Sequence, residues 1–450
     1  MFLAALFCEV KGLDADAKYF LTRFVQSLGT ADPAGLSVKA FATRFGLSDR
    51  QVTKSLAALV ACEVMTFSDA AGGRGRPKRC YRLQEGFHKT LIKVPGLPTT
   101  HHEVAVGNLL KHENRKAAQT SGKPEKGRLD VAALADLRNK RQPGQLSVVN
   151  RLLLGVLLCR ADRFGIVTDL GSSELCKVVG LDQVSLKHRV RRLIDQGLIR
   201  AYVPGTTSTL FFSKMKSVYV LNLNHSELSG GGDVTSVLAC VPELSLPDQM
   251  LHASNISSDV RRLKRDPQSF DGSQHLQVVR YFEGQRPSFF HLLQVMLEKY
   301  AAHLLSRYWS KLGHLPLNKR IDDPEVRDLI SDDFRPSRPP LASDSNQYAT
   351  LLDELYHGAY DLAIWIKEQF YQATDVPFET MDFVIIPRAL NSGYSPLALL
   401  ALPRSSDGRR RCLVIKRSAE SELQLELFSS ESEIPLDERR RLGLLTFPGG

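Results

Sequence analysis

The chain has 450 residues, of which 43% are hydrophobic and 24% are charged, and its formal net charge is +10 at pH 7. These proportions are typical of an ordinary globular protein and exclude wholesale disorder, while the length predicts two to four domains. The seven cysteines are scattered and form no CxxC pair, which argues against both a disulfide framework and a zinc ribbon.

The first apolar stretch, MFLAALFCEV (1–10), contains Glu9 and has no basic residue ahead of it, so it predicts a buried helix or strand rather than a signal peptide. A second apolar run, LSVVNRLLLGVLLC (146–159), is interrupted by Asn150 and Arg151 and is too short to span a membrane. We therefore expect a cytoplasmic protein without a membrane span.

A helix, a tight turn and a second helix are predicted within LSVKAFATRFGLSDRQVTKSLAALV (36–60). The apolar residues of 52–60 repeat every three to four positions, as on one face of a helix. Ser48 with Gln51 three residues later fits a capping box, and Gly46 suits the turn. VMTF (64–67) and RCYRL (79–83) then alternate like strands and are expected to pair as a hairpin.

The same pattern occurs a second time, 134 residues later and without a gap. FGLSDRQVTKSLAALVACEVM (45–65) aligns with VGLDQVSLKHRVRRLIDQGLI (179–199), so that Gly46 falls on Gly180 and the apolar positions coincide. A second hairpin is expected to pair IRAYV (199–203) with SVYVLNL (217–223).

A helix-turn-helix followed by a hairpin resembles the winged-helix transcription regulators, above all in GRGRPKRCYRL (73–83). The resemblance covers 36–83 more closely than 170–221. It implies that the second helix of each copy enters the major groove of DNA and that the hairpin reaches the adjacent backbone or minor groove.

The positive charge is concentrated in the two copies. Residues 36–83 carry nine Lys or Arg against three Asp or Glu, and residues 170–221 carry eight against three. The rest of the chain has a net charge of −1. Such a distribution is expected of surfaces that neutralise phosphates.

The candidate DNA contacts of the first copy lie on its second helix and hairpin: Ser48, Asp49, Arg50, Gln51, Thr53, Lys54, Arg74, Arg76, Lys78 and Arg79. Arginine and glutamine side chains suit guanine and adenine edges, and arginines in a glycine-rich hairpin suit a narrow minor groove. The plainer alternatives are an exposed helix face and a hairpin tip kept soluble by its charge.

The candidates of the second copy are more basic and suit phosphate anchoring rather than base discrimination: Gln183, Ser185, Lys187, His188, Arg189 and Arg192. Its hairpin carries Leu210, Phe211 and Phe212 where the family would have basic residues. This departure leaves a dimerisation or docking unit as the alternative for this copy.

We predict a mixed fold of two winged-helix (α+β) domains in tandem followed by a C-terminal α+β domain. The predicted boundaries are 1–110 and 146–225 for the winged helices, 111–145 and 226–280 for linkers, and 281–450 for the C-terminal domain. That last domain combines two long aromatic-rich helices with four strands and is expected to serve assembly, signal reception or partner binding.

No catalytic motif is evident, because Walker A, GxGxxG and GxSxG patterns are missing and the histidines near 101–112 lack metal-ligand spacing. We expect no enzyme activity, no cofactor and no metal.

The predicted function is a bacterial-type transcription regulator that binds double-stranded DNA, forms a homo-oligomer and contacts a second protein through its C-terminal domain. The alternatives are a replication initiator of a plasmid or mobile element, and a docking scaffold that does not bind DNA.

Overall fold

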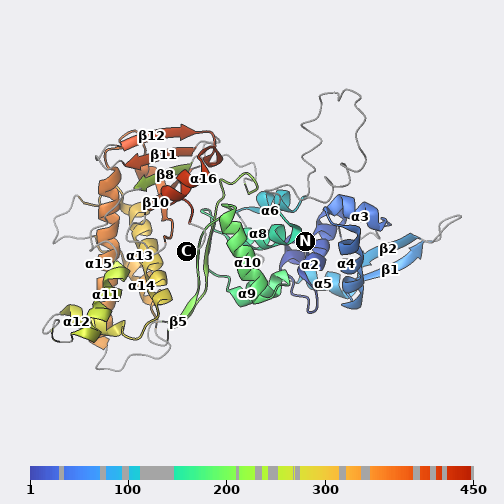
Figure 1. The fold of residues 1–450 in the computed structure, drawn as a ribbon, viewed down its shortest axis with the longest axis horizontal. Coiled ribbons are helices and arrows are strands. Elements are labelled where there is room, and N and C mark those ends of the chain that lie inside the picture. The colour runs from blue at the N-terminus through green and yellow to red at the C-terminus, as the bar shows by residue number, and fades with distance from the viewer. Residues whose placement is uncertain are drawn as a thin grey trace. The chain divides into compact units, whose positions relative to one another are not determined.

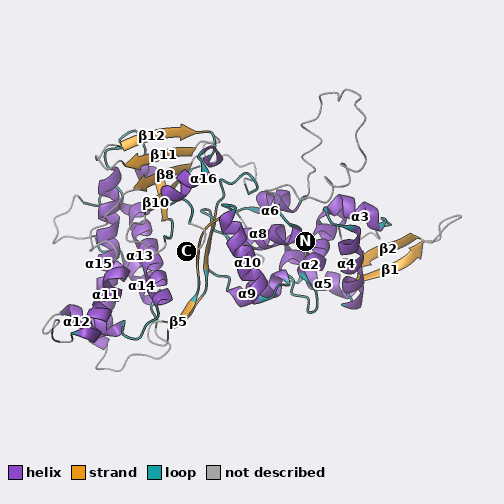
Figure 2. Cartoon of the chain, viewed as in Figure 1, coloured by secondary structure: helices purple, strands orange, loops and turns teal. Residues whose placement is uncertain are grey.

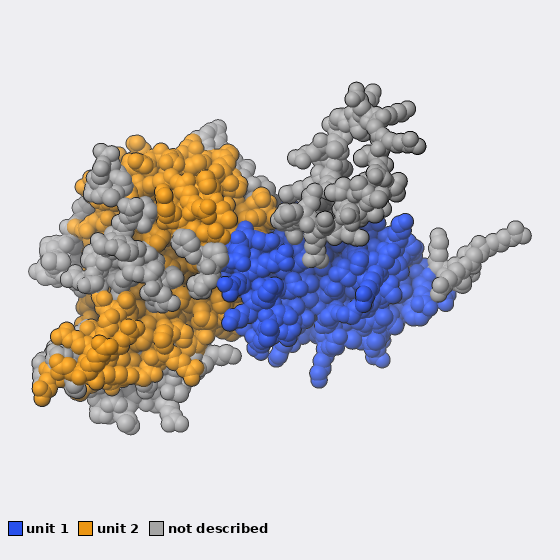
Figure 3. All heavy atoms as spheres, in the orientation of Figure 1, with its two compact units in different colours: residues 1–161, 172–196 blue, residues 162–171, 197–450 orange. Residues whose placement is uncertain are grey.

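The computed structural model describes residues 1–29, 35–70, 78–93, 101–111, 146–208, 212–228, 236–241, 252–266, 268, 274–313, 321–335, 345–388, 396–405, 412–417 and 423–446. The fold is mixed α+β, as predicted (Figure 2). The chain divides into two compact units, shown in different colours in Figure 3: unit 1 comprises 1–161 and 172–196, and unit 2 comprises 162–171 and 197–450. No described helix combines the length and the apolar character needed to cross a membrane.

Unit 1 consists mainly of helices (Figure 1). They are α1 (Phe2–Phe7), α2 (Ala15–Leu28), α3 (Val38–Phe45), α4 (Asp49–Ala61), α5 (Glu85–Ile92), α6 (Glu103–Leu110), α8 (Val148–Arg160), α9 (Ser172–Val179) and α10 (Gln183–Asp195). Strands β1 (Met65–Ala70) and β2 (Lys78–Leu83) pair antiparallel, with Met65 opposite Leu83. The first predicted hairpin is therefore confirmed.

Phenylalanines form the core between α2 and α3. The ring of Phe20 lies 5.4 Å from that of Phe41 and 5.2 Å from that of Phe45, both in edge-on arrangements that aromatic pairs favour. Helix α4 packs against both α2 and α3 through its buried stripe. This packing leaves the opposite side of α4 facing solvent.

Helix α8 joins the two copies within unit 1. It packs against α1, α2, α6 and α9, and every residue from Val149 to Cys159 is buried. A helix that is apolar on all sides is expected to be buried in this way. Arg151 of α8 and Tyr19 of α2 donate hydrogen bonds of 2.9 and 3.1 Å to the carbonyl oxygens that end α6.

Unit 2 contains the second hairpin. Strands β3 (Ile166–Val167), β7 (Val218–Leu221) and β4 (Ile199–Val203) form one sheet in that order, and β5 (Thr206–Ser208) pairs with β6 (Phe212–Met215). The predicted pairing of 199–203 with 217–223 is confirmed, because β4 and β7 run antiparallel.

A five-stranded sheet and the remaining helices complete unit 2. Its strands are β12 (Leu423–Phe428), β11 (Cys412–Arg417), β8 (Ser236–Val241), β10 (Leu397–Pro403) and β9 (Met381–Ile385), in that spatial order. All neighbours are antiparallel except β11 and β8. The helices are α11 (His252–Arg265), α12 (Gln274–Tyr281), α13 (Pro287–Tyr308), α14 (Pro324–Asp333), α15 (Ser345–Phe370) and α16 (Leu436–Arg441).

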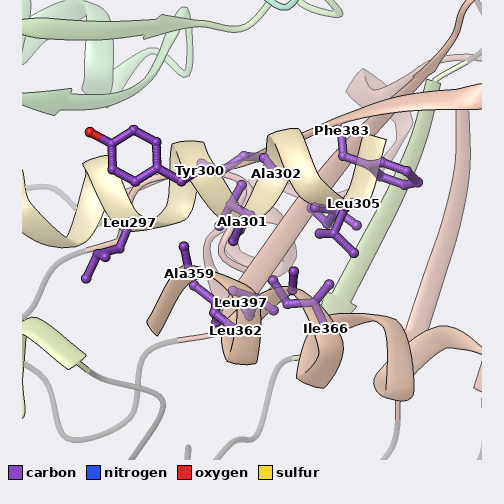
Figure 4. Packing of buried hydrophobic residues seen from close by; sticks show 14 of the residues in the cluster. Leu297, Tyr300, Ala301, Ala302, Leu305, Ala359, Leu362, Ile366, Phe383 and Leu397 are labelled. Atoms are coloured by element: carbon purple, nitrogen blue, oxygen red, sulfur yellow. The ribbon is translucent and has the colours of Figure 1, made fainter. Parts of the chain in front are cut away.

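The core of unit 2 lies where α13 packs against α15 and β9. Leu305 of α13, Ile366 of α15 and Phe383 of β9 belong to one cluster of buried apolar side chains (Figure 4). The two long helices and four strands predicted for 281–450 are present as α13, α15 and β9 to β12.

The range 226–280, which the sequence predicts as a flexible linker, includes β8 and α11 in the structure. All six residues of β8 are buried, so this central strand shows no alternation of polar and apolar residues. The second predicted winged-helix range, 146–225, contributes helices to unit 1 and strands to unit 2. The predicted domain boundaries stay a prediction.

Candidate nucleic-acid interface

The turn before α4 is built by local chemistry. Gly46 ends α3 in the left-handed region at φ 67°, a conformation that costs other residues energy. Ser48 then caps α4: its hydroxyl accepts from the backbone N–H of Gln51 at 3.2 Å, and the Gln51 side chain accepts from the Ser48 N–H at 3.0 Å. The predicted capping box is confirmed.

Helix α4 buries Val52, Leu56 and Leu59 and exposes four predicted contacts: Asp49, Arg50, Thr53 and Lys54. The Thr53 hydroxyl donates to the carbonyl oxygen of Asp49 at 2.9 Å, within the same helix. Arg50 is exposed and makes no hydrogen bond or ion pair with any described residue. Its guanidinium is therefore available to a ligand.

Gln51 and Lys54 instead contact the start of α2. The Gln51 amide donates to a carboxylate oxygen of Asp16 at 3.1 Å, and the Lys54 ammonium lies 2.5 Å from a carboxylate oxygen of Asp14. The hydrogen bond to Asp14 raises the pKa of Lys54. Burial opposes ionisation of Asp14, but the bonds from Lys54 and from the Ala17 N–H outweigh it and lower the Asp14 pKa. Both predicted contacts thus have intramolecular partners.

The hairpin places Arg79 on an exposed strand. Its guanidinium lies 4.7 Å from the ring centroid of Phe67, and its Nε is 3.9 Å from a carboxylate oxygen of Asp69. Lys78 begins β2, and its side chain lies outside the described part of the chain. Arg74 and Arg76 also lie outside the described residues, as do Leu210 and Phe211 and the side chain of Phe212 in the second hairpin.

The second copy repeats the local design with a different cap. Gly180 has φ 76°, and Asp182 caps α10 by accepting from the N–H of Ser185 at 2.8 Å and from its hydroxyl at 2.7 Å. These two bonds, the backbone one first, lower the pKa of Asp182. The hydroxyl of Ser185 is therefore engaged in the cap.

Helix α10 exposes a basic face opposite its buried stripe: Gln183, Val184, Lys187, His188, Arg191 and Arg192 are exposed. Arg189 is half-buried and donates to the side-chain oxygen of Asn150 at 3.0 Å. Val184, which sequence analysis did not single out, is 79% exposed. Val184 lies three, four and seven residues before Lys187, His188 and Arg191, and this spacing could have placed it on the same exposed face of the helix. An apolar side chain on that face suits contact with a thymine methyl group.

A hollow of about 300 Å³ in unit 1 brings residues of the two copies together. We call it the inter-copy groove; its lining residues are Asp16, Gln51, Ser147, Val148, Val149, His188, Arg189 and Arg192. Four of the sequence-predicted contacts therefore share one site. Asp16 and the start of α8 were missed because they lie outside both repeated segments.

One basic residue of the second copy does not belong to the surface. Arg200 is 1% exposed and pairs with the buried Glu431, and its Nη1 donates to the carbonyl oxygen of Leu444 at 3.1 Å. Burial opposes ionisation of Glu431, but Arg200 outweighs it and lowers the Glu431 pKa. The net charge counted for 170–221 therefore overstates the charge available to phosphates.

Among the described residues, no three His, Cys, Asp or Glu side chains gather as metal ligands would. In comparisons with known proteins, no family model and no curated protein matches the chain.

Proposed function

We propose that the protein is a transcription regulator that binds duplex DNA through two winged helices. The first would comprise α3, α4, β1 and β2, and the second would use α9 and α10 as its helix-turn-helix. The observation that carries the proposal is the repeated local design. In both copies a glycine with positive φ leads into a capped helix that buries one apolar stripe and exposes an opposite polar face, which is strongly basic in α10.

The two exposed faces suit different contacts. Arg50 on α4 has an exposed guanidinium beside the short polar side chains of Asp49 and Thr53, and this combination is suited to contact with a guanine edge. On α10, Lys187, His188 and Arg192 form a basic face suited to the phosphate backbone. The first helix would then specify the sequence, and the second would supply affinity that depends on salt.

Assembly, localisation and partners complete the proposal. The protein would act in the bacterial cytoplasm as a homo-oligomer, with the C-terminal part of unit 2 serving self-association or contact with a second protein. The proposed activity requires no cofactor and no catalytic group.

The test starts with duplex affinity as a function of salt. Each phosphate contact contributes about 0.9 to the slope of log affinity against log salt, so Lys187→Ala should lower the slope by about that amount. Lys93→Ala, which removes an exposed cation at the end of α5, is the control and should leave the slope unchanged. A salt-independent or undetectable duplex affinity would favour the docking scaffold.

Recovery of the DNA bound in cells then separates regulator from initiator. Sites that overlap promoters support regulation. Directly repeated sites at a replication origin would replace the proposal with a replication initiator.

A further inference from the structure

The inter-copy groove has walls from both copies and from the helix that joins them. Gln51 belongs to the first copy, and Asp16 belongs to α2, which packs against α4. His188, Arg189 and Arg192 belong to α10, and the remaining lining residues lie at the start of α8. A volume of about 300 Å³ is at the small end of the range for ligand pockets. The groove therefore fits a group such as a sugar phosphate rather than a base pair.

Hydrogen bonds hold the walls in place. Arg189 donates to the side-chain oxygen of Asn150 at 3.0 Å, and Asn150 is itself only 1% exposed. On the opposite wall, the side chain of Gln51 is held between Ser48 and Asp16. These side chains do not have to reorganise before a ligand binds, which lowers the entropic cost of binding.

The charge in the groove favours an anion. Arg189 and Arg192 carry permanent positive charges, and Arg192 makes no ion pair with any described residue. Asp16 supplies one negative charge, so the two arginines leave the lining with a net positive charge. Guanidinium groups match the geometry of phosphate oxygens. The lining also includes Ser147, Val148 and Val149 at the N-terminus of α8, an end of a helix that favours an anion.

The spacing of the two copies across the groove is fixed by close packing. A Cβ atom at Gly180 would lie 2.7 Å from the carbonyl oxygen of Leu13, so the turn before α10 rests directly on the backbone that leads into α2. Helix α8 packs against α2, which packs against α4, and against α9, which packs against α10. Within unit 1, α4 and α10 are therefore held in one arrangement rather than tethered.

We propose that the inter-copy groove binds one phosphate of the DNA backbone, so that the two copies grip a single continuous stretch of duplex. This inference rests on the proposed DNA-binding function. Arg192 contacts the phosphate, Arg189 positions it from the α8 side, and Asp16 limits the affinity by repulsion.

The experiment combines protein variants with neutral backbone linkages. A duplex is first selected from a random pool by the wild-type chain, and each phosphate is then replaced in turn by an uncharged methylphosphonate. For wild type, one replaced linkage should weaken binding about tenfold. For Arg192→Ala the same linkage should have no further effect, because the contact is already lost.

Arg191→Ala is the matched control, because Arg191 immediately precedes Arg192 on α10, is exposed and does not line the groove. It should leave the effect of that linkage unchanged. A duplex that the wild type selects and binds, but on which no linkage couples to Arg192, overturns the groove contact and leaves the proposed function standing. Failure to select or bind any duplex overturns both.

A second variant tests the sign of the charge effect. Asp16→Asn keeps an oxygen that can accept from Gln51 and removes the negative charge, so it should strengthen duplex binding several-fold. Asp195→Asn makes the same change in net charge at the far end of α10 and should have a smaller effect. Equal effects of the two variants would assign the gain to overall charge and would count against the groove.

Discussion

Arg50 and Gln51 are neighbours on α4 with different surroundings. Arg50 is exposed, whereas the Gln51 side chain bonds to Ser48 and to Asp16. Arg50→Ala should cost about 1 to 3 kcal/mol on the preferred duplex and little on random DNA, since it removes a base contact. Gln51→Ala should instead lower the free energy of unfolding by about 0.5 to 1.5 kcal/mol, because it removes the side-chain bonds to Ser48 and Asp16.

Competition binding with selected and random duplexes, together with urea unfolding, measures both effects. A loss of equal size on the two duplexes would assign Arg50 to the phosphate backbone. A base-specific loss for Gln51→Ala without a change in unfolding would show that its intramolecular bonds open on binding.

Lys18 is a buried cation of α2. Its side chain donates to the carbonyl oxygen of Cys8, the residue is 2% exposed, and burial lowers its pKa to about 8. The unfolded chain keeps this proton up to the ordinary value of 10.5, so between pH 8 and 10.5 the unfolded state binds more protons than the folded state. The contribution of Lys18 to the free energy of unfolding therefore rises with pH between pH 8 and 10.5.

Comparison with Lys18→Met isolates this effect. Between pH 7 and pH 9.5 the free energy of unfolding of wild type should rise by about 2 kcal/mol relative to the variant, at about 1.4 kcal/mol for each pH unit above the folded pKa. Urea unfolding at the two pH values measures it, with the exposed Lys93→Met as control. A constant difference between wild type and Lys18→Met would mean that Lys18 keeps its proton throughout.

The residues of the candidate site differ in how far sequence could predict them. Ser48 and Gln51 form their capping box within one turn, so spacing alone revealed it. The bonds from Gln51 to Asp16 and from Lys54 to Asp14 join residues 35 and 40 positions apart. Such contacts depend on how α2 packs on α4, which local periodicity does not encode.

At the scale of elements, the turn from α9 to α10 packs directly against the backbone that leads into α2. Gly180→Ala would place a methyl group 2.7 Å from the Leu13 carbonyl oxygen and would also strain a positive φ. The strain costs about 1 to 2 kcal/mol, and the overlap with backbone adds about 1 to 3 kcal/mol. Gly29→Ala is the control, because Gly29 has φ 74° but no atom within 4 Å of the added methyl position.

Urea unfolding and hydrogen exchange in α2 and α10 would measure the result. Gly180→Ala should be the more destabilising of the two variants and should speed exchange in both helices. Equal decreases in the free energy of unfolding would mean that backbone strain dominates and that the backbone at Leu13 shifts at little cost to accommodate the methyl group.

Elements with a clear period were predictable, and elements defined by distant partners were not. The hairpin of β1 and β2 and the strands β9 to β12 follow from alternation or from apolar runs bounded by turns. Strand β8 is short, fully buried and flanked by Gly, Ser and Pro, and its neighbours in the sheet, β10 and β11, begin more than 150 residues later in the chain. Only the completed sheet identifies it as a central strand.

At the scale of the whole molecule, the basic face of α10 and the exposed apolar strip of β12 lie in different units. The exposed polar face of α4 and the exposed basic face of α10 belong to unit 1. In unit 2, Leu425 and Leu427 of the edge strand β12 are 44% and 60% exposed, and they lie opposite Ile415 and Leu413 of β11. An edge strand with an exposed apolar strip favours pairing with another chain. Self-association is therefore expected to use unit 2 and DNA binding to use unit 1.

The double variant Leu425→Lys, Leu427→Lys tests this division of labour. Light scattering should show wild type above the mass of one chain and the variant at that mass, because buried lysines would oppose association. Affinity for a short duplex with one site should stay the same. Affinity for a long natural site should fall, because two associated chains gain through effective concentration what a single chain lacks.

The control is Gln424→Lys, which places a positive charge on the other face of β12 and should leave the mass unchanged. If wild type is already a single chain, β12 is not an assembly surface, and the exposed strip becomes a candidate contact for a second protein.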